Sequence, residues 1–193
     1  MLASQIMALA NSYPEGALLS AKGLLHLGAR AGIDQALHRL AKSGELIRIS
    51  RGRYVLPVSS RFGQLAPEPQ VVIAAFEAET SEAIMPTGIA AANALGLTTQ
   101  MPMHESYITA GPRRQLRFGK QVVQIQHAPR WQTLLPHRQA GSVIRALAWL
   151  GEAFAGRKLR ELQLPQEEWR ALLQVTPRLP AWMAKAITEV GHA

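Results

Sequence analysis

The chain has 193 residues, enough for one domain or two small ones. Apolar residues make up 48% of it and aromatic residues only 6%, so the core must consist mainly of Leu, Ala, Ile and Val. The absence of cysteine excludes disulfides and thiolate metal sites and fits a reducing compartment. Lys and Arg outnumber Asp and Glu by 21 to 13, and this net charge of +8 favours polyanionic partners, nucleic acid before acidic membrane.

The first residues lack the basic and apolar regions of a secretory signal, and no apolar run approaches the roughly 18 residues of a spanning helix. We therefore expect a cytoplasmic protein without a membrane partner.

The chain begins with a predicted amphipathic helix over residues 1–12, which Pro14 and Gly16 end. The apolar segment 17–19 can pair as a third strand with a later hairpin. Ser20 is the predicted N-cap of a short helix over residues 21–27. The inward side chains of that helix are expected to be Leu24, Leu25 and Leu27.

The helix expected over residues 30–43 has two distinct faces. Its apolar residues recur at helical spacing and fall on one arc: Ile33, Ala36, Leu37, Leu40 and Ala41. The opposite arc carries hydrogen-bonding and cationic groups: Gln35, His38, Arg39 and Lys42. No carboxylate lies on that arc, because Asp34 falls at its edge.

A hairpin should follow this helix. Gly44 suits the left-handed residue after a helix end, and the segments 46–49 and 54–56 read as strands around the tight turn Arg51-Gly52-Arg53. A helix followed by a ribbon with a basic tip is typical of a winged helix-turn-helix. Such a unit places its helix in the major groove and its wing against the neighbouring backbone or minor groove.

The rest of the chain predicts helices and a small meander. Helices are expected at 70–79, 89–95, 143–155 with Ser142 as cap, 165–175 and 181–190, with a turn at 84–88 and an irregular connection at 128–141. The small residues of 89–95 suggest a helix–sheet contact. Strands are expected at 106–110, 115–118 and 122–126. One face of this meander should carry Tyr107, Thr109, Leu116, Phe118, Val123 and Ile125.

The predicted fold class is therefore α+β in two domains. A winged helix-turn-helix would occupy residues 1–58, and the Pro- and Ser-rich segment 59–70 would be a connector. A C-terminal domain over residues 71–193 would combine a small antiparallel sheet with several helices.

The DNA-binding hypothesis assigns roles to individual side chains. Gln35 suits a bidentate contact with adenine, and Arg39 suits guanine or phosphate. Phosphate contacts are expected from the preceding helix, and wing arginines can enter a narrow minor groove. The full candidate set is Ser20, Lys22, Arg30, Gln35, His38, Arg39, Lys42, Arg51 and Arg53. The alternative reading of this helix is an ordinary solvated face.

A second basic cluster follows at residues 111–140, which hold six basic and no acidic residues. Its central members are Arg113, Arg114, Arg117 and Lys120, with Arg130 and Arg138 beyond them. Either the cluster protects a sheet edge from aggregation, or it forms a second nucleic-acid surface for flanking DNA or for RNA.

Catalysis is not expected, and no metal or cofactor is predicted. Asp34 is the only aspartate, and two-metal sites need closely spaced acids. The glutamates Glu77, Glu79 and Glu82 fit the solvated face of a helix. The histidines lack ligand spacing, and no nucleophile elbow or phosphate-binding glycine loop occurs.

Several segments together resemble the AbiEi antitoxins of type IV toxin–antitoxin systems. They include Tyr13–Gly16, Leu27–Arg30, Asp34–Leu40, Gly44, Arg48-Ile49, Gly52–Tyr54, Pro86–Ala91, Asn93, Leu95–Thr98, Thr109–Pro112 and Pro180–Trp182. One departure is Ala29, where the family often has a hydroxyl residue as helix cap, a difference of about 1 kcal/mol.

The resemblance implies a winged helix that represses its own operon and a C-terminal domain that supplies antitoxicity against a nucleotidyltransferase toxin, without a stable complex. We therefore expect a sequence-specific transcriptional repressor that binds double-stranded DNA of its own promoter at inverted repeats. A homodimer would suit paired half-sites, although no heptad seam specifies one. The alternative is a protein- or RNA-interaction module whose winged helix is purely structural.

Overall fold

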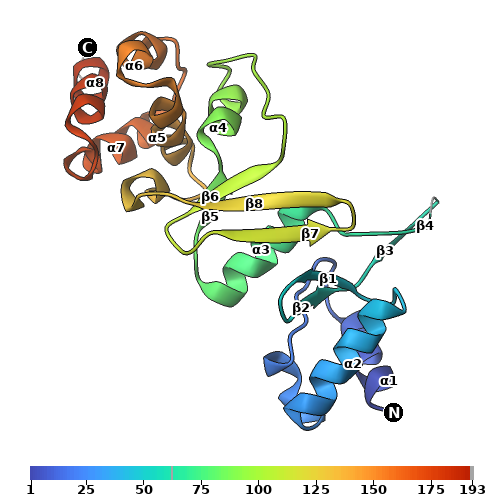
Figure 1. The fold of residues 1–193 in the computed structure, drawn as a ribbon. Coiled ribbons are helices and arrows are strands. Elements are labelled where there is room, and N and C mark those ends of the chain that lie inside the picture. Colours follow the sequence, from blue (N-terminus) through green and yellow to red (C-terminus); the bar gives the residue numbers. More distant parts are fainter. Residues whose placement is uncertain (62, 192–193) are drawn as a thin grey trace. The chain divides into compact units, whose positions relative to one another are not determined.

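The computed structural model describes residues 1–61 and 63–191 and has an α+β fold (Figure 1). It divides into two compact units. Unit 1 comprises residues 1–82 and 114–124, and unit 2 comprises residues 83–113 and the chain from 125 onward. This division differs from the predicted domains, because helix α3 (Pro69–Thr80) and most of the hairpin formed by β7 (Arg114–Phe118) and β8 (Gln121–His127) belong with the N-terminal elements.

Unit 1 begins with helices that lie on one side of a β-hairpin (Figure 1). Its first elements are α1 (Leu2–Ser12), the 3-10 helix η1 (Lys22–Leu27), α2 (Arg30–Lys42), β1 (Ile47–Ser50) and β2 (Arg53–Val55). Strands β1 and β2 pair antiparallel. The predicted third strand is present as a single bridge, in which Leu19 and Tyr54 exchange backbone hydrogen bonds of 2.8 and 2.9 Å.

The apolar arc of α2 forms the centre of this core. Ile33, Ala36 and Leu37 are fully buried, and Leu40 is nearly so, as the helical spacing predicts. The expectation for η1 is only partly correct: Leu24 is buried, but the side chain of Leu25 is 48% exposed. The tighter 3-10 winding changes which side chains share a face, so an α-helical period misplaces Leu25.

The rest of unit 1 contains β3 (Val58–Ser60), β4 (Gly63–Leu65), α3 (Pro69–Thr80), β7 (Arg114–Phe118) and the first part of β8 (Gln121–His127). Strands β3 and β4 form a two-stranded hairpin within the segment expected to be a plain connector. Residue 62 of that connector lies outside the described residues.

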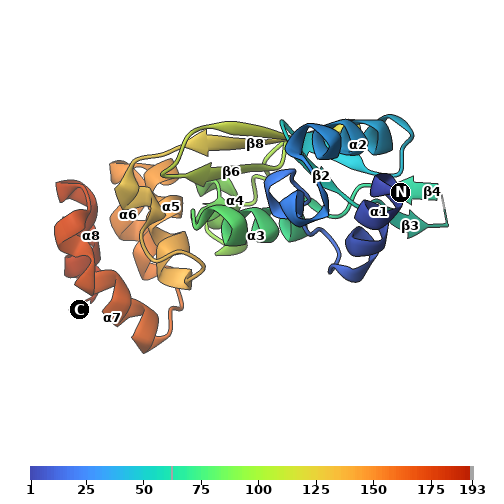
Figure 2. The same cartoon turned by 90° about the horizontal axis from the view of Figure 1, so that it is seen from below.

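Unit 2 contains β5 (Ile84–Pro86), α4 (Gly88–Ala94), β6 (Ser106–Thr109), η2 (Arg130–Thr133), α5 (Gln139–Leu150), α6 (Glu152–Arg160), α7 (Gln166–Gln174), η3 (Thr176–Arg178) and α8 (Ala181–Gly191). Helices α5 to α8 gather into one bundle (Figures 1 and 2). Strand β5, expected to be a turn, pairs antiparallel with β6. These two strands belong to a four-stranded sheet with the strand order β5-β6-β8-β7.

The strand alternation predicted for the meander is confirmed on β7 and β8, whereas in β6 Ile108, between Tyr107 and Thr109, is buried as well. The six side chains predicted for one face are between 0 and 6% exposed: Tyr107, Thr109, Leu116, Phe118, Val123 and Ile125. The predicted helix–sheet role of the small residues in α4 is wrong. Helix α4 packs against another helix, α5, and a Cβ on Gly88 would lie 2.5 Å from the carbonyl oxygen of Arg145.

The single helix predicted for 143–155 is also wrong at both ends. Helix α5 begins four residues earlier, at Gln139, where Glu168 accepts the Ala140 N–H at 2.8 Å and pairs with Arg138. Gly151, with φ of 83°, then separates α5 from α6. A carboxylate from a distant helix therefore caps α5, in place of the predicted Ser142.

One arginine of α5 is buried inside unit 2. Arg145 is 2% exposed, and its only hydrogen bond among the described residues joins one terminal nitrogen to the Ser142 hydroxyl at 2.9 Å. Burial lowers the pKa of Arg145 to about 10. The guanidinium is thus still charged at neutral pH, with two of its nitrogens unpartnered.

Candidate nucleic-acid interface

The outer face of α2 is open. Gln35, His38, Arg39 and Lys42 are all exposed, while the opposite side of the helix supplies the core. Asp34, at the edge of this face, lies 3.7 Å from Arg30 in an exposed i,i+4 pair. The face therefore presents donors and cations, and its neighbouring carboxylate already has a cation beside it.

The helix start is as the sequence predicts, although it lacks a side-chain cap. Ala29 occupies the N-cap position without a side-chain hydrogen bond, and α2 begins at Arg30. Before it, the Ser20 hydroxyl accepts the Gly23 N–H at 3.4 Å, and Lys22 is exposed on η1. These two residues lie in the segment that leads into α2.

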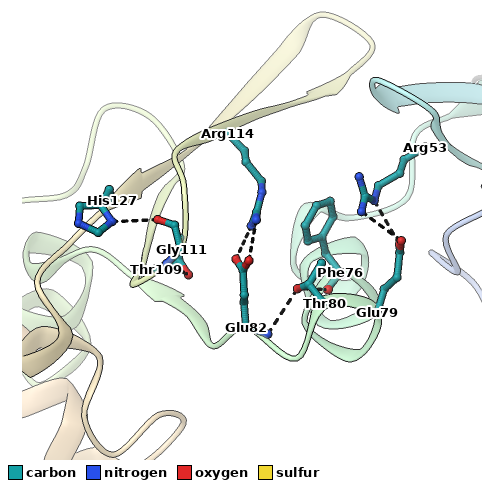
Figure 3. A network of polar contacts seen from close by, with 9 residues as sticks. All are labelled: Arg53, Phe76, Glu79, Thr80, Glu82, Thr109, Gly111, Arg114 and His127. Carbon is teal, nitrogen blue, oxygen red and sulfur yellow. Dashed lines mark hydrogen bonds and ion pairs between the residues drawn. The ribbon is translucent and has the colours of Figure 1, made fainter.

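The two wing arginines are placed differently. Arg51 is exposed in the turn between β1 and β2, beside Gly52, whose φ of 70° suits a glycine. Arg53 instead points to α3, where its Nε and a terminal nitrogen donate to the two oxygens of Glu79 at 3.2 and 3.1 Å (Figure 3). Arg53 is therefore held in an ion pair with Glu79, whereas Arg51 is exposed at the tip of the β1–β2 hairpin.

A second arginine is held in the same way. Arg114, at the start of β7, donates to both oxygens of Glu82 at 2.5 and 2.7 Å (Figure 3). Both arginines also lie over the ring of Phe76, which is 1% exposed: the guanidinium carbons of Arg53 and Arg114 are 4.7 and 5.2 Å from its centroid. We call the five residues Arg53, Phe76, Glu79, Glu82 and Arg114 the α3 clamp.

The α3 clamp joins two strands to α3 and to the segment just after it, because Arg53 comes from β2 and Arg114 from β7, while Glu82 follows the end of the helix. Its carboxylates are partly exposed, so each pair contributes modestly, about 0–1 kcal/mol. The hydrogen bond from Arg114 holds the pKa of Glu82 below its usual value, against the opposing effect of burial. Glu79 and Glu82, predicted as a solvated helix face, are therefore structural partners of arginine.

A basic groove lies between β1, the turn that follows it, and β7. Its cavity volume is about 370 Å³, and its lining residues are Arg48, Ile49, Ser50, Arg51, Gln115 and Arg117. Arg51 of the predicted wing and Arg117 of the second basic cluster, 66 residues apart in sequence, thus line the same cavity. None of these lining residues is acidic.

Sequence reasoning missed part of this groove. Arg48, Ser50 and Gln115 are not among the predicted site residues, since Arg48 reads as a solvated strand position. The β1–β2 register is irregular between Arg48 and Ser50, which the sequence does not signal. Only the approach of β7 to β1 shows that these residues face a common cavity.

The members of the second basic cluster are divided between the two units and have different partners. Arg117 lines the groove, Lys120 is exposed at the β7–β8 turn, and Arg114 belongs to the α3 clamp. Arg113 is exposed in unit 2, where Arg138 pairs with Glu168 at 2.8 Å.

One histidine of unit 2, His127, has a backbone partner. His127 contacts the Gly111 carbonyl at 2.9 Å through its Nδ1 atom (Figure 3).

Within residues 1–61 and 63–191, no three His, Asp or Glu side chains gather as a metal site would require. No helix in the same ranges has the length and apolarity to cross a bilayer.

The comparisons with known proteins give a family but no function. The model of a family of unknown function, DUF6088, matches residues 5–163, and the chain belongs to this family. No curated protein and no solved structure matches the chain.

Proposed function

We propose that this DUF6088 member is a sequence-specific DNA-binding repressor, in which residues 1–58 act as a winged helix-turn-helix. Helix α2 would enter the major groove, and the β1–β2 turn would be the wing. The observation that carries the proposal is the face of Gln35, His38, Arg39 and Lys42, which is exposed and free of carboxylates although the helix's other side is buried.

Element order and pairing support this reading. Three helices precede a two-stranded antiparallel hairpin, and Leu19 bridges to β2 as the third strand of a winged helix does. Arg51 is exposed at the tip of the hairpin, where a wing meets the DNA backbone or minor groove. Lys22 and Arg30 are exposed at either end of the segment that leads into α2 and suit phosphate contacts.

The resemblance to AbiEi antitoxins extends the proposal. In that role the protein would repress its own operon in the cytoplasm, bind inverted repeats in its promoter as a homodimer, and counteract a nucleotidyltransferase toxin encoded beside it. It would need neither cofactor nor metal and would not be an enzyme. A neighbouring nucleotidyltransferase gene supports this extension, and its absence counts against the antitoxin role alone.

The test is the double variant Gln35→Ala with Arg39→Ala. Each lost bidentate base contact costs about 1–3 kcal/mol, so operator affinity should fall at least tenfold, roughly, and discrimination against other sequences should weaken. Gel shifts or fluorescence anisotropy on the promoter duplex measure both effects.

A matched control exists on α7. Gln166 and Arg170 are exposed, four residues apart, and belong to the other unit. The double variant Gln166→Ala with Arg170→Ala removes the same groups and should retain operator affinity. If the α2 variant folds and binds the operator as tightly as the wild type, α2 does not read DNA, and the interaction-module alternative gains.

A further inference from the structure

We infer that the basic groove of unit 1 is a binding site for phosphates of the DNA backbone, in which Arg117 of β7 acts together with Arg48 and Arg51. The inference rests on the proposed function in taking DNA as the ligand, but it concerns sequence-independent affinity rather than base reading. The groove is lined by three arginines, Arg48, Arg51 and Arg117.

The chemistry of the groove suits a phosphodiester. Three guanidinium groups offer planar sets of N–H donors that match phosphate oxygens, and the Arg48 Nε donates at the same time to the Ser50 carbonyl at 3.4 Å. Ser50 and Gln115 add neutral donors, and the Gln115 amide also donates to Gln124 at 3.3 Å. No lining residue is acidic, so an anion entering the groove meets no repulsive charge. All three arginines are exposed, so they keep their charge available to a ligand.

The groove is also held in shape. Its arginines come from β1, the following turn and β7, and the α3 clamp ties both β2 and β7 to α3. The aromatic centre of that clamp, Phe76, is buried and contacts both clamp arginines. The spacing between Arg51 and Arg117 is therefore set by the fold, which lowers the cost of ordering them on a ligand.

Strand β7 extends the basic surface of unit 1 beyond the predicted winged helix. A winged helix of 58 residues ends its basic surface at the wing tip, whereas β7 adds Gln115 and Arg117 beside that tip. Because all of the groove residues belong to unit 1, the site is complete within that unit. We expect it to bind backbone phosphates next to the base pairs that α2 contacts.

The test uses the full chain with Arg117→Gln and, as control, Arg160→Gln, which removes an arginine that is also exposed, from α6 in unit 2. Affinity is measured on an operator duplex and on a random duplex over a range of salt. Loss of one phosphate contact should lower the slope of log affinity against log salt by about 0.9 and weaken binding about five- to tenfold near 0.1 M salt. Both duplexes should be affected equally, and Arg160→Gln should change neither quantity.

The outcomes separate this inference from the proposed function. If Arg117→Gln matches the wild type in slope and affinity, the groove does not bind backbone, even when the α2 variant loses its operator. If the α2 variant keeps its operator affinity while Arg117→Gln weakens the random duplex, the groove stands and base reading by α2 fails.

Inorganic phosphate, added at constant ionic strength, tests the other source of the same chemistry. Weak competition at millimolar phosphate fits a backbone site. Tight phosphate binding that Arg117→Gln abolishes, with DNA affinity unchanged, would overturn the inference in favour of a site for a free anion.

Discussion

The two units carry the same net charge but use it differently. Unit 1 has eleven Lys and Arg against seven Asp and Glu, and unit 2 has ten against six, a surplus of four in each. In unit 1, three arginines line the basic groove, which has no acidic lining residue. Further cations lie on the exposed face of α2. In unit 2, Arg138 pairs with Glu168, Lys158 with Glu161, and Arg145 is buried.

This difference teaches that net charge does not locate a nucleic-acid surface. What distinguishes unit 1 is that three arginines, Arg48, Arg51 and Arg117, line one groove without an acidic residue among its lining residues. The acids Glu79 and Glu82 of the same unit pair with two other arginines, Arg53 and Arg114. The following predictions challenge this comparison in decreasing order of expected effect.

The largest effect should come from Phe76→Ala in unit 1. Removing a buried aromatic ring leaves a cavity and takes away the contact surface of both clamp arginines, so the free energy of unfolding should fall by about 3–5 kcal/mol. Chemical denaturation measures it. The control is Phe154→Ala in unit 2, whose ring is 47% exposed with the Arg157 guanidinium 5.5 Å from its centroid. That change should cost less than about 1 kcal/mol. Equal effects would show that the α3 clamp is not a structural centre.

A change of opposite sign is expected from Arg145→Met in unit 2. The substitution removes a buried charge with two unpartnered nitrogens, so the free energy of unfolding should rise by about 1–3 kcal/mol. Arg138→Met is the matched control and should lower the free energy of unfolding, because it leaves the carboxylate of Glu168 without its arginine partner. A marked loss of stability in Arg145→Met would show that the buried guanidinium has a stabilising partner.

The smallest effect concerns pH and Glu82. Because the folded-state pKa of this carboxyl lies below its ordinary value of 4.5, its stabilising contribution is present above that value. The contribution is lost as pH falls from there through the folded pKa. Glu82→Gln should therefore lower the free energy of unfolding by about 1 kcal/mol or less at pH 7, and the difference from wild type should vanish in acid.

Denaturation curves at several pH values measure this loss. The control is Glu15→Gln, an exposed carboxylate in the loop after α1, which should be nearly neutral. A Glu82→Gln deficit that persists unchanged in strong acid would mean that the ion pair with Arg114 is not its source.

The sequence was sufficient where local periodicity decides the structure. The spacing of Ile33, Ala36, Leu37 and Leu40 predicts both the extent of α2 and its buried side, and the alternation at Leu116, Phe118, Val123 and Ile125 predicts the sheet face. Both depend on neighbours in sequence.

Long-range contacts were beyond the sequence. The capping of α5 by Glu168 and the pairing of Arg53 with Glu79 join segments 28 and 26 residues apart, and no local signal marks either partner. The groove needs β7 beside β1, so Arg48 and Gln115 carry no recognisable pattern of their own. For that reason the α2 candidates follow from the sequence, whereas the groove follows only from the fold.

The most direct test of the central claim is the affinity of the wild-type chain for the duplex upstream of its own gene, measured against a scrambled duplex of equal length and composition at the same salt. The account predicts a preference of at least about a thousandfold, as specific regulators show. Equal affinities for the two duplexes would contradict it.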